Sequence, residues 1–324
     1  MRVELARRRS SIVFAIALCV VFLTSVSNGL AESFDRIVIF GDSLSDPGNH
    51  YVAFGMTSQA PFAPLPDFPY GIGGHHFSNG ATWAEQLTRA LGMPTSGKPA
   101  LRAPGVFTNY AVGRARARAG ARDFPYFDLS SQVHQFLTDF RGQAPSNALY
   151  VIWIGANDLD DALITGQTDP AGAAEIIRAA VTTVAGNVYG LWAAGARHVV
   201  ILNLPDPALA PFIRALGPPV QAAATRVGML YNAALDEAVM QVSGLPGLQL
   251  VRFDVKAVFD DIVATQGDTG VINVTDACLS FGVVVDAVCR HPNRYLFWDG
   301  AHPTKAGHHL IAEAALRLFD DDAE

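Results

Sequence analysis

A serine follows directly on a short apolar run near the start of the chain. Residues 37–40 read Ile-Val-Ile-Phe, and Gly41, Asp42 and Ser43 come next. A buried strand that turned here into a helix would present Ser43 at the carboxyl edge of a sheet, where open α/β sheets bind ligands, beside the free N–H groups of a helix end. The pattern predicts a nucleophilic serine. A plain helix cap by Asp42 and Ser43 is the alternative that it leaves open.

A second pair of reactive groups lies near the other end of the chain. A serine nucleophile needs a base to take its proton, and the base needs a carboxylate to hold its tautomer. Asp299 and His302 have a suitable spacing, because an aspartate three residues before a histidine in one turn can reach the imidazole Nδ1. Taken alone, the pair is better explained by a turn aspartate beside a surface histidine.

Two further apolar runs end in residues that could donate hydrogen bonds. Residues 148–154 lead to Gly155 and Asn157, whose side-chain amide could stabilise an oxyanion; by itself, Asn157 is also typical of a turn. Residues 108–112 predict a short strand that ends at Gly113, where the missing Cβ atom would let a backbone N–H approach a substrate.

These residues must be positioned by alternating strands and helices. Runs rich in β-branched residues predict buried strands, and apolar residues at steps of three and four predict helices. The expected strands cover residues 36–40, 148–154, 198–204 and 248–254, and the expected helices lie near 177–191, 221–242 and 305–319. Such alternation implies right-handed crossovers and a parallel sheet covered on both faces. We expect one α/β domain, a three-layer α/β/α sandwich, over residues 32–324, with long loops at 60–80 and 265–294.

Composition excludes several classes of protein. The chain has 324 residues, a net charge of −7 and 16% charged residues, which disfavours a nucleic-acid binder or a polybasic membrane-surface protein. Residues 1–31 resemble a signal peptide, because arginines precede an apolar run at 12–23 that is shorter than the roughly 20 residues of a membrane span. We therefore expect export to the periplasm or the medium; a retained anchor is the alternative.

Cysteine and histidine usage agrees with export and argues against a metal site. The expected mature chain keeps Cys278 and Cys289, which an oxidising compartment would pair; two buried thiols are the alternative. The adjacent pairs at 75–76 and 308–309 do not match zinc spacing. The acidic residues at 158–161 lack the glycine and glutamate of a calcium loop, and we expect them to form a solvated acidic loop.

Together, the serine, glycine, asparagine and histidine at four strand ends resemble the SGNH hydrolases, also called the GDSL lipase and esterase family. The resemblance covers most of residues 32–324. Its further motifs are Phe77-Ser78-Asn79-Gly80 with Trp83, Leu204-Pro205, Tyr231-Asn232 and the ending from Trp298 to Thr304. It implies a flavodoxin-like fold. The chain departs from the family at Arg114, where members often carry a small residue.

The resemblance also implies a role for each residue. Ser43 would be the nucleophile, His302 the base and later acid, and Asp299 its partner. The oxyanion donors would be the N–H groups of Ser43 and Gly113 and the side chain of Asn157.

The implied protein is a monomeric, exported ester hydrolase that needs no cofactor and acts on small-molecule or lipid esters. Three readings stay open: a phospholipase or lipid acyltransferase, a silent lipid- or glycan-binding module, and transient contact with membrane lipid. We expect short to medium acyl chains, with aromatic residues of 62–77 lining the acyl groove. The arginines at 114, 116, 118 and 122 are expected to form a solvated face; an anionic-substrate clamp, which would favour phospholipid, is the alternative.

Overall fold

The computed structural model describes residues 34–55, 75–119, 127–281 and 285–319. The predicted signal peptide at 1–31, most of the aromatic loop at 62–77, and Arg122 lie outside these ranges. Within them, no helix combines the length and the apolar character that crossing a membrane requires.

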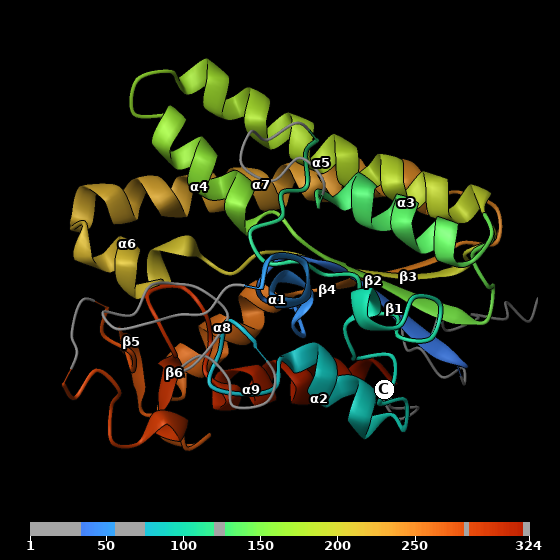
Figure 1. The fold of residues 1–324 in the computed structure, drawn as a ribbon. Helices are drawn as coiled ribbons and strands as arrows, with labels where there is room; N and C mark the ends of the chain where they lie inside the picture. The colour runs from blue at the N-terminus through green and yellow to red at the C-terminus, as the bar shows by residue number, and fades with distance from the viewer. Residues whose placement is uncertain (1–33, 56–74, 120–126, 282–284, 320–324) are drawn as a thin grey trace, which may run out of the picture.

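The described residues contain a parallel sheet of four strands, in the order β1-β2-β3-β4 (Figure 1). The strands are β1 (Arg36–Gly41), β2 (Ala148–Trp153), β3 (His198–Leu202) and β4 (Gln249–Phe253). β2 and β3 are buried along their whole length and β1 nearly so, as expected when helices cover both faces of a parallel sheet. The predicted strands and their parallel arrangement are confirmed.

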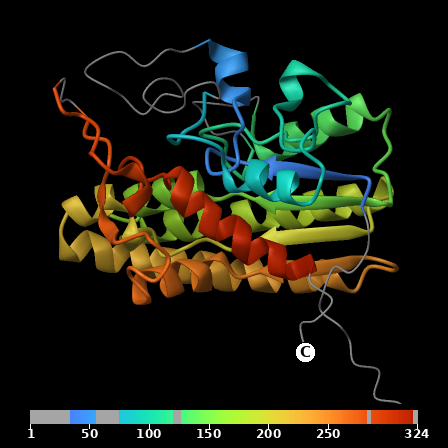
Figure 2. The same ribbon diagram turned by 90° about the horizontal axis from the view of Figure 1, so that it is seen from below.

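Helices lie on both sides of this sheet and complete the predicted α/β/α sandwich (Figures 1 and 2). On one side are α3 (Leu129–Asp139), α4 (Ala156–Thr165), α5 (Pro170–Ala193) and α7 (Pro218–Ser243); on the other are α2 (Trp83–Ala90), α8 (Val255–Ala264) and α9 (Lys305–Leu316). The predicted stripe on α5 is buried throughout. The shorter elements are α1 (Asn49–Phe54), α6 (Pro211–Ala215) and the 3₁₀ turns η1 (Ala100–Arg102), η2 (Pro207–Leu209), η3 (Pro292–Arg294) and η4 (Arg317–Phe319).

The strand predicted at residues 108–112 is an extended segment rather than a regular strand. It runs parallel to β1 and makes three backbone hydrogen bonds with it, including Val112 N–H to the Gly41 carbonyl at 3.1 Å. The backbone N–H and carbonyl of Asn109 bond instead to Lys98 and Ala100, on the side away from β1. The segment therefore does not form a regular strand ladder. Counted as a strand, the segment produces the flavodoxin-like order 2-1-3-4-5, in which ligands bind where the strand order reverses.

The predicted long loop at 265–294 contains one strand of a small second sheet, and the other strand follows the loop directly. Its strand β5 (Asn273–Ala277) pairs in parallel with β6 (Tyr295–Phe297). Cys278 and Cys289 form the predicted disulfide. The N–H groups of Cys278 and Leu279 bond to the carbonyls of Phe297 and Trp298, so the disulfide-bonded loop supports the chain just before Asp299.

Candidate active site

Ser43 follows β1 but lies in a turn and not at the start of a helix, so the predicted helix after residue 43 is wrong. The Asp42 carboxylate accepts the Leu44 N–H at 3.1 Å, and α1 begins only at Asn49. The reason is Asp46, which is fully buried and accepts the N–H groups of residues 48, 49 and 50 at 2.6–3.0 Å. These bonds place the helix start six residues downstream of Ser43.

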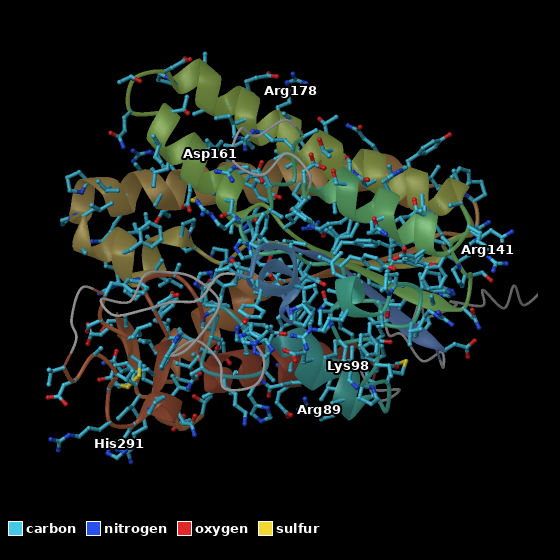
Figure 3. All side chains as sticks on the ribbon, in the orientation of Figure 1. Arg89, Lys98, Arg141, Asp161, Arg178 and His291 are labelled. Atoms are coloured by element: carbon cyan, nitrogen blue, oxygen red, sulfur yellow. A yellow bond between two sulfur atoms is a disulfide. The ribbon has the colours of Figure 1, made fainter. Side chains whose placement is uncertain are left out.

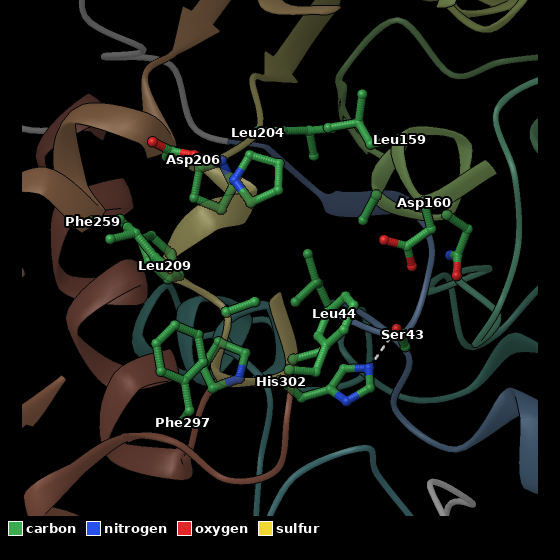
Figure 4. A pocket seen from close by; sticks show the side chains of 18 residues that line it. Ser43, Leu44, Leu159, Asp160, Leu204, Asp206, Leu209, Phe259, Phe297 and His302 are labelled. Atoms are coloured by element: carbon green, nitrogen blue, oxygen red, sulfur yellow. Dashed lines mark hydrogen bonds between the residues drawn. The ribbon is translucent and has the colours of Figure 1, made fainter. Parts of the chain in front are cut away.

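The serine is joined to the distant histidine and aspartate by hydrogen bonds (Figure 4). His302 Nε2 lies 2.8 Å from Ser43 Oγ, and His302 Nδ1 lies 2.7 Å from Asp299 Oδ2. The other oxygen, Asp299 Oδ1, accepts the N–H groups of Ala301 and His302 at 2.8 and 2.7 Å. The structure thus brings the predicted nucleophile, base and carboxylate together from the two ends of the chain.

Burial and charge act in opposite directions on this ion pair. Burial favours the neutral forms, but the attraction and the hydrogen bond between the two side chains outweigh it. The pKa of Asp299 is therefore lowered and the pKa of His302 is raised. Asp42 and Asp160 add to the negative potential that raises the pKa of His302. A carboxylate that stays ionised beside the imidazole suits a base that must accept a proton.

The segment at 77–79 holds the turn that carries His302. The Phe77 ring packs against the imidazole with a centroid distance of 5.2 Å. Ser78 Oγ donates to the Pro303 carbonyl at 2.8 Å, and the Lys305 N–H donates to Asn79 Oδ1 at 2.6 Å. These residues, noted in the sequence only through the family resemblance, therefore fix the position of the base.

Asn157 is the second residue of α4 and lines the same pocket as Ser43. Its amide donates one N–H to the Ala115 carbonyl at 2.9 Å, and a second N–H remains for another acceptor. Gly155 shapes this turn: it has φ 124°, and a Cβ there would lie 2.2 Å from the Tyr231 hydroxyl oxygen. The Tyr231 hydroxyl in turn donates to the Ile154 carbonyl at 2.8 Å.

The backbone N–H of Gly113, predicted as an oxyanion donor, has a partner in the structure. Its N–H donates to Asp46 Oδ2 at 2.7 Å and is therefore already engaged. A Cβ at this position would lie 2.1 Å from Phe77 Cε2, so the glycine makes room for the ring that supports His302. In this structure the missing Cβ leaves room for the Phe77 ring.

Two of the arginines and two of the aspartates that were expected to face solvent are paired with each other. Arg118 binds Asp158 at 2.6 Å and also binds Asp161, and Arg116 binds Asp161 at 2.7 Å. Asp158 is fully buried, and Asp161 lies on α4 (Figure 3). Among the described residues, Arg116, Arg118, Asp158 and Asp161 therefore form one ion-pair cluster in place of two solvated faces, whereas Arg114 is exposed as expected. Only Asp160 of this acidic run is exposed.

Two positioning residues went unnoticed in the sequence. The Gln132 side chain on α3 accepts the Gly41 N–H at 2.9 Å and donates to the Gly41 carbonyl at 2.8 Å, which anchors the end of β1. Asp46 ties residues 48–50 to Gly113. The Gly-Asp-Ser run points to Asp42. It gives no indication that Asp46, three residues after Ser43, bonds to the distant Gly113.

A pocket of about 180 Å³ opens beside Ser43 (Figure 4). Its walls are mostly apolar and come from residues 204–212, the start of α4, α8, β6 and the His302 loop. Phe77, the described member of the expected aromatic groove, packs on His302 and does not line this pocket. In the part of the chain that the structure describes, no cluster of histidine, cysteine, aspartate or glutamate could hold a metal ion.

The chain is similar in sequence to a known protein family and to several named proteins. A family model described as GDSL-like lipase/acylhydrolase matches residues 37–315. Thermolabile hemolysin of Vibrio parahaemolyticus is 27% identical over 90% of this chain and 66% of its own length. Lipase 1 of Photorhabdus luminescens is 23% identical over 96% of this chain and 54% of its own length. Phosphatidylcholine-sterol acyltransferase of Aeromonas hydrophila is 29% identical over 96% of this chain and 98% of its own length. The chain thus spans less than two thirds of the first two relatives and nearly all of the third.

Proposed function

The chain belongs to the GDSL-like lipase/acylhydrolase family, and from this premise we propose that it is an exported carboxylic ester hydrolase that works through an acyl-enzyme on Ser43. The observation that carries the proposal is the continuous hydrogen-bonded series from Ser43 through His302 to Asp299, with bonds of 2.8 and 2.7 Å. This series opens onto an apolar pocket, as a serine hydrolase of apolar esters requires.

The reaction would proceed in two halves. Ser43 Oγ attacks the ester carbonyl carbon while its proton passes to His302 Nε2, and the alcohol leaves with that proton. Water then attacks the carbonyl carbon of the acyl-enzyme and gives a proton to His302. The bond from that carbon to Ser43 Oγ breaks, His302 returns the proton to Ser43 Oγ, and the carboxylic acid leaves. Asp299 stabilises the imidazolium formed in each half.

The oxyanion would be held by the Ser43 N–H and the second N–H of the Asn157 amide. Asn157 lines the pocket next to Ser43, and preorganised donors of this kind stabilise the charge that develops on the carbonyl oxygen. Gly113 could act as a third donor only if Asp46 released its N–H, so our proposal keeps Gly113 as a packing residue for Phe77.

Acyl transfer is the second candidate, favoured by the relative named as an acyltransferase, which matches 98% of its own length. The same acyl-enzyme would be intercepted by an alcohol in place of water.

Export is supported by the Cys278–Cys289 disulfide, since disulfides persist in oxidising compartments.

The test compares wild type with Ser43→Ala and a matched control, Ser243→Ala, at an exposed position on α7. Wild type and the control should hydrolyse p-nitrophenyl butyrate and react with a fluorophosphonate probe, and Ser43→Ala should do neither while keeping its circular dichroism spectrum. Turnover by folded Ser43→Ala would refute the mechanism. Folded wild type without turnover or labelling would instead indicate a binding module. Adding an alcohol acceptor and measuring the new ester separates transfer from hydrolysis.

A further inference from the structure

One wall of the pocket is a short segment, residues 204–212, that is built to be rigid; we call it the proline wall. It contains prolines at 205, 207 and 211, each of which fixes its backbone φ angle. At one end, the Asn232 amide bonds to both the N–H and the carbonyl of Leu204, at 3.0 and 2.8 Å. At the other end, the Phe212 N–H donates to the Gly300 carbonyl at 3.0 Å, between Asp299 and His302.

The remaining walls are apolar except on the α4 side, where Asn157 and the exposed Asp160 line the pocket. Figure 4 shows Ser43 and His302 on one side of the pocket, with Leu209, Phe259 and Phe297 across from them. Phe259 comes from α8 and is only 2% exposed, so its ring is held by the core behind it. A wall with fixed φ angles and tied ends, facing a packed phenyl ring, cannot expand easily to admit a longer ligand.

We propose that this pocket is the acyl-chain site and that it takes chains of about six to eight carbons, with Phe259 and Leu209 setting the limit. A dry cavity of about 150 Å³ holds one benzene molecule, and this pocket is slightly larger at about 180 Å³. The inference rests on the proposed hydrolase, because it assigns the acyl half of that enzyme's substrate.

The pocket suits the acyl half and not the alcohol for a chemical reason. The acyl carbon stays bonded to Ser43 after the alcohol has left, so an apolar cavity that begins at Ser43 holds the acyl chain in both halves of the reaction. The alcohol must receive its proton from His302 and then leave, and water must take its place. Each acyl methylene buried before the pocket is full should raise kcat/KM by about fourfold, and chains too long for the rigid pocket should react more slowly.

The experiment measures kcat/KM for p-nitrophenyl esters from acetate to palmitate and, separately, for alkyl acetates from methyl to octyl. Three variants accompany wild type. Leu209→Trp fills the pocket from the proline wall, where the native side chain is half-buried. Phe259→Leu enlarges it with little loss of core volume, and Phe253→Leu is the matched control, a phenylalanine on β4 that is 7% exposed and does not line the pocket.

Wild type should be fastest at hexanoate to octanoate, about 250-fold above acetate if four more methylenes are buried and about 4,000-fold if six are. Leu209→Trp should move the optimum to butyrate or shorter, Phe259→Leu should move it to longer chains, and Phe253→Leu should leave it in place. Ser43-dependent turnover with an optimum that neither pocket variant moves, or a preference that follows the alkyl acetates, would overturn the acyl site alone. Absence of Ser43-dependent turnover on every ester would overturn the hydrolase and the acyl site together.

Discussion

The sharpest test of the proposed triad is Asp299→Asn. Asp299 Oδ1 accepts two backbone N–H groups, those of Ala301 and His302, so an asparagine must keep its oxygen there. Its NH₂ group would then replace Oδ2 opposite His302 Nδ1, at a position where the native distance is 2.7 Å. Because an NH₂ group can only donate, Nδ1 would become the acceptor and Nε2 would carry the proton. His302 could then no longer take a proton from Ser43.

The size of the effect follows from this change of tautomer. The same substitution in the serine protease triad lowers kcat by about 10⁴, which corresponds to roughly 5 kcal/mol, and we expect a similar loss here. The fold should survive, because both backbone hydrogen bonds of Oδ1 are kept. Loss of the negative charge also lowers the pKa of His302, which Asp299 now raises. The base acts only when neutral, so the acidic limb of the pH–rate profile should move to lower pH.

The assay is kcat against pH for the fastest p-nitrophenyl ester, with folding checked by circular dichroism. Asp268→Asn, at an exposed position, is the matched control and should equal wild type. A folded Asp299→Asn protein that keeps more than about a tenth of the wild-type kcat would refute the tautomer argument. A large loss of kcat with no shift of the acidic limb would show that Asp299 acts by holding the turn and not through its charge.

Three further predictions address the donors, the disulfide and a buried carboxylate. Asn157→Ala should lower kcat by about 10²–10³ with little change in KM; a rise mainly in KM would mean that Asn157 binds the substrate. Reducing the Cys278–Cys289 bond should cost about 3 kcal/mol of stability and lower activity, as measured by thermal melts and turnover with and without reductant, whereas two titratable thiols in the exported protein would contradict the pairing. Burial raises the pKa of Asp42 to about 7, so wild type loses stability as pH rises from about 4 to 7, by at most about 4 kcal/mol. Asp42→Asn should therefore have a higher Tm than wild type at pH 8 and nearly the same Tm at pH 4; equal differences at both pH values would disprove the shift.

The sequence alone was enough to predict the parts of this protein that depend on local patterns. Buried strands of a parallel sheet read as short β-branched runs, so the ends of β1 to β4 were located to within two residues. Parallel strands present their carboxyl ends at one edge of the sheet. The serine after β1 and the asparagine after β2 were therefore expected to meet, and both line one pocket.

Tertiary structure decided the features that depend on contacts between distant residues. Asp46 delays the helix after Ser43 and occupies the Gly113 N–H, 67 residues away. Arg118 and Asp158, 40 residues apart, form one ion pair instead of two solvated faces. The pocket is formed by the proline wall together with Phe259 of α8. Residue types show which groups can bond or pack, but the choice among many possible partners is made only when the packed core brings particular side chains within a few ångströms of each other.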